Sequence, residues 1–314
     1  MSARSGIVVV GSINMDLVAT ASRIPSVGET IIGTGFQVNP GGKGANQAVA
    51  VGRLGYPVRM IGRVGDDAFG SQLIANLQSA GVDCRSVAVS EGSSGVAVIL
   101  VSEAGDNCIV VAPGANALVS PEDIDANIEV IRSAGMVLAQ LEIPIETVEH
   151  LAAVCSRESV PLMLDPAPAR SLGKSILQNV TWFTPNEIEA AFYAPAAADT
   201  ENSAQAAQVL LESGCGGIVL KMGARGAYMT STSISGSDVT SFPVNAVDTT
   251  AAGDAFNGAF ATALMLGKPP LESATFAAAA AALSVTRPGA QASMATRDEV
   301  EAFLTLHTSP SAHP

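Results

Sequence analysis

The sequence has few of the side chains on which nucleophilic and metal-dependent sites are commonly built. Its four cysteines show no Cys-x-x-Cys or Cys/His spacing of the kind that binds zinc or forms a redox pair. Its three histidines are isolated from one another, which argues against a histidine triad or a histidine metal centre. We therefore expect reduced thiols, as in cytosolic proteins, and we look for chemistry among carboxylates, amides and backbone groups.

Basic residues and long apolar runs are also scarce. The chain has 16 Lys and Arg against 29 Asp and Glu, for a net charge of −13, and such a surface repels nucleic acids and anionic membranes. The longest apolar tract, Phe276–Leu283, is too short to span a bilayer, and Ile7–Val10 is too short for a secretion signal. These absences favour a cytoplasmic protein with no nucleic-acid or membrane partner.

A repeated pattern of short apolar runs predicts the fold class. With 314 residues and 48% hydrophobic side chains, the chain is long enough to form a full core. The runs, most of them separated by helix-like segments, are Ile7–Val10, Val58–Ile61, Met136–Leu141, Val160–Leu164, Val180–Thr184 and Ile218–Leu220. Such runs predict an α/β fold with a mostly parallel sheet. The polar residues that follow the strands then lie along one edge of the sheet, where ligands bind.

Two segments do not fit this pattern, because no helix separates them from their neighbours. Thr30–Val38 is predicted to be an extended strand. Gly95–Val101 and Asn107–Ala112 are predicted to form a hairpin with apolar side chains on both faces. If one face of this hairpin covers a substrate, the other face still needs a partner.

Residues 248–254, with the sequence Asp-Thr-Thr-Ala-Ala-Gly-Asp, lie between an extended run, Phe242–Val247, and a predicted helix, Ala255–Leu266. Oxygens of Asp248 and of the two threonines suit a helix start, and the small residues after them leave backbone N–H groups open to an anion such as phosphate. Asp254 would repel that anion, which suggests a base that takes the proton from a hydroxyl attacking phosphorus. The alternative is a capping segment in which Asp254 only favours the helix dipole.

Another segment, residues 39–47 (Asn-Pro-Gly-Gly-Lys-Gly-Ala-Asn-Gln), is rich in glycine and opens a helix that is predicted to end at Leu54. Its glycines allow a ligand to meet the backbone, and Lys43 and Asn46 offer polar contacts. It lacks the Gly-x-x-x-x-Gly-Lys-Ser/Thr spacing of a P-loop. Together with residues 248–254, this segment resembles the two signatures of the ribokinase family of sugar and nucleoside kinases. Further matches are Gly11–Asp16, Asp165–Ala169 and Thr184–Glu187, and the resemblance extends from about Ile7 to Leu306.

The resemblance implies a fold and an activity. The fold is a single domain, residues 1–314, with a Rossmann-like core and a small β-sheet lid from about residues 16–40 and 93–112. The activity is ATP-dependent phosphorylation of D-ribose at its 5-hydroxyl, which yields D-ribose 5-phosphate and ADP. Asp254 would be the base, and the N–H groups of Ala252, Gly253 and Asp254 would form the anion hole. The sugar would be held by Asn14, Asp16, Gly42, Asn46 and Glu142, with Lys43 nearby.

The resemblance also implies sites for ATP, Mg²⁺ and K⁺. The loop Lys221–Gly226, which includes Gly223, would border ATP together with Gly253, and Asn186 and Glu189 would be linked to Mg²⁺ and phosphate. A monovalent cation would lie beside the anion hole, at Asp248, Thr250, Ser284, Arg287, Gly289 and Ser293. Three residues depart from the family pattern: Lys221 stands where Thr is frequent, Ala277 replaces a His often found beside adenine, and Pro288 alters the cation loop.

Several alternatives stay open at this point. A kinase of the same family could act on deoxyribose, another sugar or a nucleoside, although Phe36 is the only aromatic residue in the predicted lid segments and a base-stacking site is therefore disfavoured. A sugar-binding protein without catalysis is a further alternative, and the intact Asp254 and glycines argue against it. The apolar hairpin predicts a homodimer that pairs through the lids.

Overall fold

The computed structural model describes residues 4–195 and 203–308, so the ends of the predicted domain, 1–3 and 309–314, lie outside the described residues. A nine-stranded sheet runs through the molecule in the order β13-β12-β11-β10-β9-β8-β1-β4-β5. Its strands are β1 Ile7–Val10, β4 Val58–Gly65, β5 Val82–Ser90, β8 Met136–Ala139, β9 Leu162–Leu164, β10 Trp182–Phe183, β11 Gly217–Lys221, β12 Ala227–Ser231 and β13 Ile234–Val239. All pairs from β11 to β5 are parallel, and β12 and β13 add an antiparallel edge. The predicted α/β class with a mostly parallel sheet is confirmed.

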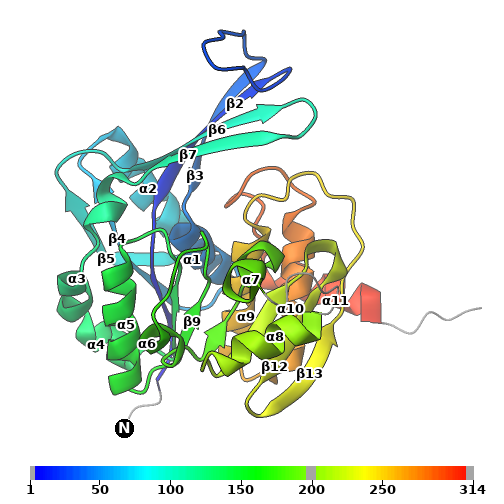
Figure 1. The fold of residues 1–314 in the computed structure, drawn as a ribbon. Coiled ribbons are helices and arrows are strands. Elements are labelled where there is room, and N and C mark those ends of the chain that lie inside the picture. Colours follow the sequence, from blue (N-terminus) through cyan, green and yellow to red (C-terminus); the bar gives the residue numbers. More distant parts are fainter. Residues whose placement is uncertain (1–3, 196–202, 309–314) are drawn as a thin grey trace, which may run out of the picture.

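Helices cover both faces of this sheet (Figure 1). They are α1 Lys43–Arg53, α2 Ala68–Ser79, α3 Pro121–Ala126, α4 Ile128–Ser133, α5 Ile145–Arg157, α6 Lys174–Leu177, α7 Glu187–Tyr193, α8 Ser203–Glu212, α9 Ala252–Met265, α10 Pro270–Ser284 and α11 Arg297–Thr308. Successive side chains of a strand point to opposite faces. Ile7 and Val9 accordingly pack in one core with α1, α9 and α10, whereas Val8 and Val10 pack in the other with α5. Two separate hydrophobic layers therefore hold the strand ends in fixed positions.

A second, four-stranded sheet projects from the α/β body (Figure 1). Its order is β3-β2-β6-β7, with β2 Asn14–Ala21, β3 Gly35–Gly41, β6 Gly95–Ser102 and β7 Asn107–Ala112. The predicted hairpin is present as the antiparallel pair β6 and β7. Because β2 follows β1 almost directly and β3 leads straight into α1, the small sheet is joined to the body at the carboxyl edge of the large sheet.

The strand bounds predicted for this region are wrong. The predicted strand Thr30–Val38 is displaced, because β3 pairs with β2 from Gly35 opposite Thr20 to Gly41 opposite Asn14, and residues 30–34 lie outside any strand. Asn14 and Asp16 lie in the strand β2, which follows β1. Phe242–Val247, predicted as an extended run, forms no strand.

Candidate active site

The start of α9 is an uncapped helix N-terminus. Its N-cap, Ala251, has a left-handed backbone (φ 60°), and no side chain bonds the first turn. The N–H of Ala252 reaches the carbonyl of Thr249 at 3.3 Å, whereas the N–H groups of Gly253 and Asp254 have no partner among the described residues. The predicted capping by Asp248 and the threonines is wrong, because Asp248 accepts hydrogen bonds from the N–H groups of Thr250 (2.9 Å) and Gly289 (2.8 Å). Two backbone donors therefore remain available to an anion.

Asp254 lies in the first turn of this helix, and its carboxylate is buried, with 4% of the residue exposed. Asn46 donates to one oxygen at 2.9 Å and Gln47 donates to the other at 3.1 Å. Burial raises the pKa of Asp254 to about 6, although the nearby Lys43 and the two amides act in the opposite direction. The side chain is thus a held carboxylate beside an anion-binding helix end, with a pKa closer to neutrality than an exposed aspartate has.

The side chains predicted to bind sugar meet around Asp254. Asp16, in β2, receives no hydrogen bond from a described residue, and burial together with Glu142 and Asp254 raises its pKa to about 7. Burial lowers the pKa of Lys43, but Asp254 and the carboxylates near it reverse this effect and hold the pKa above its usual value. Glu142 accepts from the backbone N–H of Lys43 at 3.1 Å and from the hydroxyl of Ser12 at 2.5 Å.

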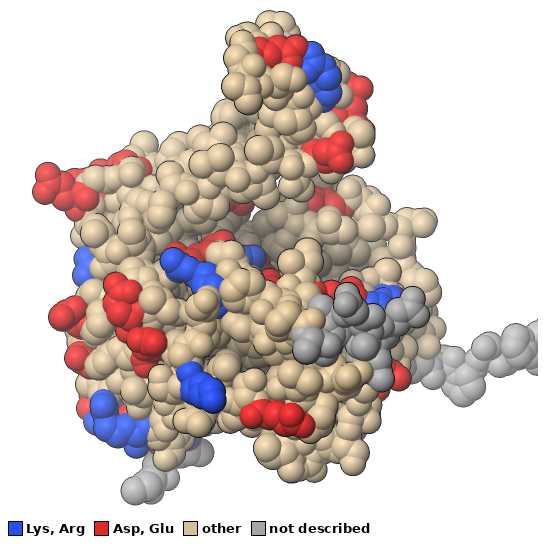
Figure 2. All heavy atoms as spheres, in the orientation of Figure 1, with Lys and Arg blue, Asp and Glu red and all other residues tan. Residues whose placement is uncertain are grey.

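Asn14 and Gly42 complete this group. The Asn14 side-chain oxygen accepts from Asn116 at 2.7 Å, which orients its amide. Gly42, at φ 87°, turns the chain so closely past the N–H of Asn14 that a Cβ there would lie 2.7 Å from it. Figure 2 shows that the surface is hollowed between the small sheet and the body, with acidic and basic atoms near the hollow.

Three residues of this network were not assigned as site residues from the sequence. Gln47 bridges two carboxylates, because its amide nitrogen donates to Asp165 at 3.0 Å as well as to Asp254. Asp165 also forms a 3.2 Å ion pair with Lys221. Gln291, far along the chain, donates to Asn46 at 3.0 Å. Gln47 and Asp165 lie inside recognised sequence matches and could have been found there, whereas no local signal pointed to Gln291.

On the other side of the helix start lies a cavity of about 440 Å³. Small side chains of α10, including Ala278 and Ala281, line it together with Phe256 and the predicted loop residues Lys221, Gly223, Gly226 and Gly253. Ala277 is fully buried and does not line the cavity. The Lys221 ammonium comes within 3.4 Å of the position that a Cβ on Gly253 would occupy, so a cation lies beside the two free N–H groups.

Asn186 and Glu189 form a capping box at the start of α7. The Asn186 side chain accepts from the Glu189 N–H, and the Glu189 carboxylate accepts from the Asn186 N–H, both at 2.8 Å. Burial and the neighbouring Asp165 raise the pKa of Glu189, against the opposing effect of Lys221. The pair is therefore fixed in place at the same edge of the sheet as Lys221, whose backbone bridges to Asn186.

The residues predicted to hold a monovalent cation come from two segments. Asp248 and Thr250 lie in the turn before α9, and the others lie in residues 284–293, which run from the end of α10 into the loop after it. Asp248 joins the two parts through its bonds to Thr250 and Gly289. The Ser284 hydroxyl, at the end of α10, donates to the Ala281 carbonyl of that helix, and the Ser293 hydroxyl donates to the Ala290 carbonyl within the loop, each at 2.8 Å. Arg287 points away to Glu299 on α11, at 2.7 Å. In residues 4–195 and 203–308, no group of three or more His, Cys, Asp or Glu side chains is placed to hold a metal ion.

Two further findings concern the expectations from composition. The four cysteines are all free thiols, and Cys155 and Cys215 are buried. Within the described part of the chain, no helix is both long and apolar enough to cross a membrane.

Comparisons with known proteins agree with this geometry. The model of the family "pfkB family carbohydrate kinase" matches residues 4–297. The chain is 44% identical to the ribokinase of Bacillus subtilis over 300 residues, covering 95% of this chain and 99% of the relative. It is 38% identical to the deoxyribokinase of Salmonella typhi over 304 residues, covering 96% and 99%. The structure of Arabidopsis thaliana ribokinase complexed with ribose and ATP superposes with a TM-score of 0.88 at 34% identity, covering 96% and 99%. The resemblance found in the sequence is thereby confirmed, and the chain belongs to the pfkB family of carbohydrate kinases.

Proposed function

We propose that this chain transfers the γ-phosphoryl group of ATP to the 5-hydroxyl of D-ribose. One observation carries the proposal: the buried carboxylate of Asp254 lies between a cluster of polar side chains and a cavity, beside two free backbone N–H groups. A phosphoryl transfer needs a proton acceptor, an anion hole and two substrate sites that meet there. Ribokinases among the relatives support the choice of sugar and of ATP.

Ribose is held by Asn14, Asp16, Gly42, Asn46 and Glu142, with Lys43 beside them. Asp16 is suited to this role because its carboxylate has no partner among the described residues, and it can accept two sugar hydroxyls. Lys43 forms no ion pair within the described residues. Its ammonium therefore balances the carboxylates around it, which are Asp254, Asp165, Glu142 and Glu189, and can donate to the sugar.

In the chemical step, the oxygen of the 5-hydroxyl forms a bond to the γ-phosphorus while the bond from this phosphorus to the β–γ bridging oxygen breaks. The hydroxyl proton passes to Asp254, and the electron pair of the broken bond leaves with ADP. The N–H groups of Gly253 and Asp254 face the developing negative charge, with Ala252 as the third residue of the anion hole. Lys221 adds a positive charge next to them.

ATP occupies the 440 Å³ cavity, with its base among the α10 alanines and its phosphates toward Gly253. Gly223 and Gly226 let the phosphates approach the loop backbone. Asn186 and Glu189 would contribute oxygen atoms to the Mg²⁺ site. Oxygen ligands are those that Mg²⁺ prefers, and the metal would neutralise charge on the phosphates.

K⁺ is proposed between the Asp248 turn and the 284–293 loop. The donors there are carboxylate, hydroxyl and backbone oxygens, with Asp248, Thr250, Ser284, Gly289 and Ser293 contributing and Arg287 through its carbonyl. The cation would hold the turn that leads into α9 and so shape the anion hole. Activity should rise when K⁺ replaces a bulky organic cation at constant ionic strength, and an unchanged rate would contradict this site.

We also propose that the chain is a single cytoplasmic domain, 1–314, whose small sheet, residues 16–40 and 93–112, is a lid and pairs with the lid of a second copy. The support is a set of exposed apolar side chains on that sheet: Phe36, Val38, Val98, Ile109, Val110 and Val111. Unpartnered apolar patches of this kind mark interfaces. Sedimentation of the chain as a monomer at micromolar concentration would contradict the dimer.

The function itself is tested by following ADP release and the sugar product with purified protein, ATP, Mg²⁺ and D-ribose. Ribose-dependent release of ADP and formation of ribose 5-phosphate are expected. The relative named deoxyribokinase makes 2-deoxyribose the second candidate substrate. Faster turnover of 2-deoxyribose, or of a nucleoside, would replace ribose in the proposal, and sugar binding without turnover would support a non-catalytic protein.

A further inference from the structure

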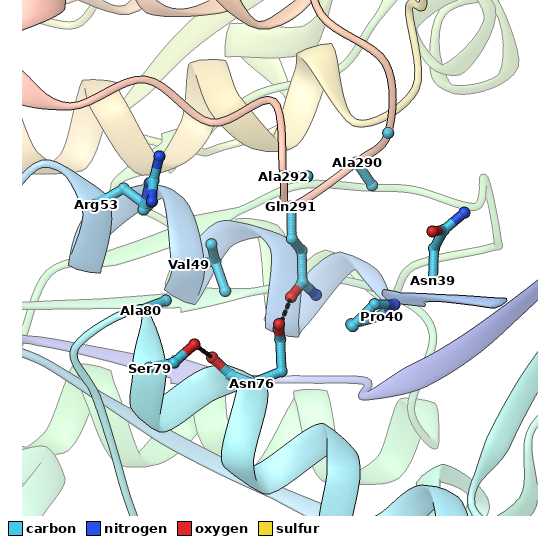
Figure 3. A pocket seen from close by; sticks show the side chains of 11 residues that line it. Asn39, Pro40, Val49, Arg53, Asn76, Ser79, Ala80, Ala290, Gln291 and Ala292 are labelled. Carbon is cyan, nitrogen blue, oxygen red and sulfur yellow. Dashed lines mark hydrogen bonds between the residues drawn. The ribbon is translucent and has the colours of Figure 1, made fainter. Parts of the chain in front are cut away.

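Four side chains from four parts of the chain form a continuous row that ends at Asp254. Asn76 on α2 donates to the Gln291 side-chain oxygen at 2.5 Å, and Gln291 donates to the Asn46 side-chain oxygen at 3.0 Å. Asn46 on α1 then donates to Asp254 at 2.9 Å. Figure 3 shows Gln291 reaching from its loop to Asn76 on α2.

The direction in which each hydrogen bond of this row is donated follows from the chemistry of the carboxylate at its end. An ionised carboxylate only accepts hydrogen bonds, so Asn46 must turn its NH₂ group toward Asp254. Its oxygen then faces the opposite way and needs a donor, because Asn46 is buried with 6% exposed. Gln291, 7% exposed, supplies that donor, and Asn76 in turn fixes the Gln291 amide.

Packing alone does not hold the Gln291 amide in this orientation. Gln291 and Asn76 line a cavity of about 170 Å³, whose wall also includes Ser79, Ala290 and Ala292 (Figure 3). A side chain that borders open space keeps its orientation through its hydrogen bonds. The two ends of the Gln291 amide bond different partners, so a change of residue type at this position disturbs Asn46 directly.

We propose that Gln291 is a positioning residue for Asp254, acting through Asn46, which it holds with its donor toward the carboxylate. The proposal rests on the proposed function for the role of Asp254 as base. Gln291 belongs to the same 284–293 loop as Gly289, whose N–H bonds Asp248. The loop that supports the start of α9 is therefore connected to Asp254 through two side-chain amides, those of Gln291 and Asn46.

Two substitutions at this position separate donation from shape. Gln291→Met keeps the length but removes the donor, so the Asn46 amide is free to rotate. Gln291→Glu offers acceptors instead, so Asn46 turns its NH₂ to residue 291 and its oxygen to Asp254. Either change weakens the bond that lowers the pKa of Asp254. Lys43, Asp165 and Asp16, the charged groups around Asp254, are unchanged in Gln291→Met, so this variant isolates the hydrogen bond. Gln291→Glu adds a carboxylate whose charge also raises the pKa of Asp254, so the larger rise in that variant combines both effects.

The test is a titration of the Asp254 carboxyl carbon by NMR in ¹³C-labelled protein without substrates, assigned with Asp254→Asn. Gln291→Met should raise the pKa of Asp254 by about half a unit or more, and Gln291→Glu by more than that. Asn76→Leu, one step farther along the row, should give a smaller rise, and Ser79→Ala, in the same cavity, should give none. Asn76→Leu also tests the row if changes at Gln291 prevent folding.

The pH dependence of kcat/KM is the second readout. Its acid limb should move upward in the variants in the same order, with activity approaching that of the wild type at high pH for Gln291→Met. An unchanged Asp254 titration in folded variants, with activity lowered equally at every pH, would assign Gln291 a purely structural role and overturn the proposal. The titration needs no turnover, so it decides this point even if the wild type does not phosphorylate ribose.

Discussion

The two sides of the α9 start differ sharply in how they are built. On the side of the small sheet, the ionisable side chains of Asp16 and Lys43 are half-buried and that of Asp254 is buried, and neighbouring amides hold Asp254. On the other side, the cavity wall consists mainly of alanines, Phe256 and backbone. A buried polar site rejects a ligand that leaves one of its groups unpaired, whereas an apolar cavity discriminates mainly by shape. We therefore expect stringent recognition of the acceptor and looser recognition of the nucleotide base.

The largest effect should come from the residue at the meeting point of the two sides. Asp254→Asn keeps the shape but removes the proton acceptor, and loss of a general base costs about 10²- to 10⁴-fold in rate. Ribose and ATP should still bind, because the other contacts survive. The measurement is kcat of the purified, folded variant, with Asp125→Asn, an exposed carboxylate on α3, as control. A variant that keeps more than about a tenth of the wild-type kcat would exclude Asp254 as base.

The polar side should distinguish sugars by their hydroxyls. Loss of the 2-hydroxyl leaves a buried polar partner at Asn14 or Asp16 without a bond, at a cost of about 1–3 kcal/mol. We expect kcat/KM for D-ribose to exceed that for 2-deoxyribose by roughly ten- to a hundredfold. Equal values measured side by side would mean that these residues are misassigned.

The polar side should also make activity depend on pH. The pKa of Asp254 is raised to about 6 and that of Asp16 to about 7, and the ionised forms are needed to accept protons and hydroxyls. kcat/KM should therefore fall as the pH drops through this range, by about tenfold per unit between the two pKa values and by about a hundredfold per unit below the lower one. A flat profile of kcat/KM between about pH 5 and 8 would show that neither carboxylate governs the rate.

The same titrations affect the free energy of unfolding in the opposite direction. Both carboxyls bind protons more tightly in the folded chain, where their pKa values are about 6 and about 7, than in the unfolded chain, where the ordinary pKa is 3.8. Their contribution to stability is complete below that value and is lost as the pH rises through about 6 to 7. Asp254→Asn removes one of these carboxyls, so the free energy of unfolding, measured by denaturant titration, should depend less on pH in this variant. The same titrations show whether the variant is folded at the pH of the activity assay.

The smallest effect should come from the apolar side. Ala281→Leu places a larger side chain in the cavity wall, and overpacking costs about 1–3 kcal/mol where the neighbours cannot move. Because the cavity is open to solvent, we expect the lower end, a rise of roughly five- to tenfold in KM for ATP. KM for ribose serves as the internal control and should not change. Equal increases in both constants would contradict a division of the site into a sugar side and a nucleotide side.

Much of the fold could be predicted from the sequence where local pattern and tertiary role agree. The buried runs at Ile7–Val10 and Met136–Leu141, and the helix after residue 254, were found because their apolar residues have no alternative to burial. The strand β5, Val82–Ser90, was missed, since it lies at the sheet edge and its polar residues and 60% exposed Val89 hide the alternation. The β-branched residues at 30–32 are typical of a strand, but the strand that pairs with β2 is β3, which begins only at Gly35.

By itself the sequence determined the glycine-rich segment 39–47, the small residues that keep the start of α9 open, and the acid within its first turn, because these depend on residue type and spacing over a few positions. Only the tertiary structure decided which side chains surround that acid. Asn46 and Gln47 reach it, and Gln291 reaches Asn46, because parallel strands end at one edge and because α1, α9 and the 284–293 loop pack there. The burial that raises the pKa of Asp254, and the use of Asp248 to tie two loops rather than to cap α9, likewise arise from contacts between distant segments that no local pattern encodes.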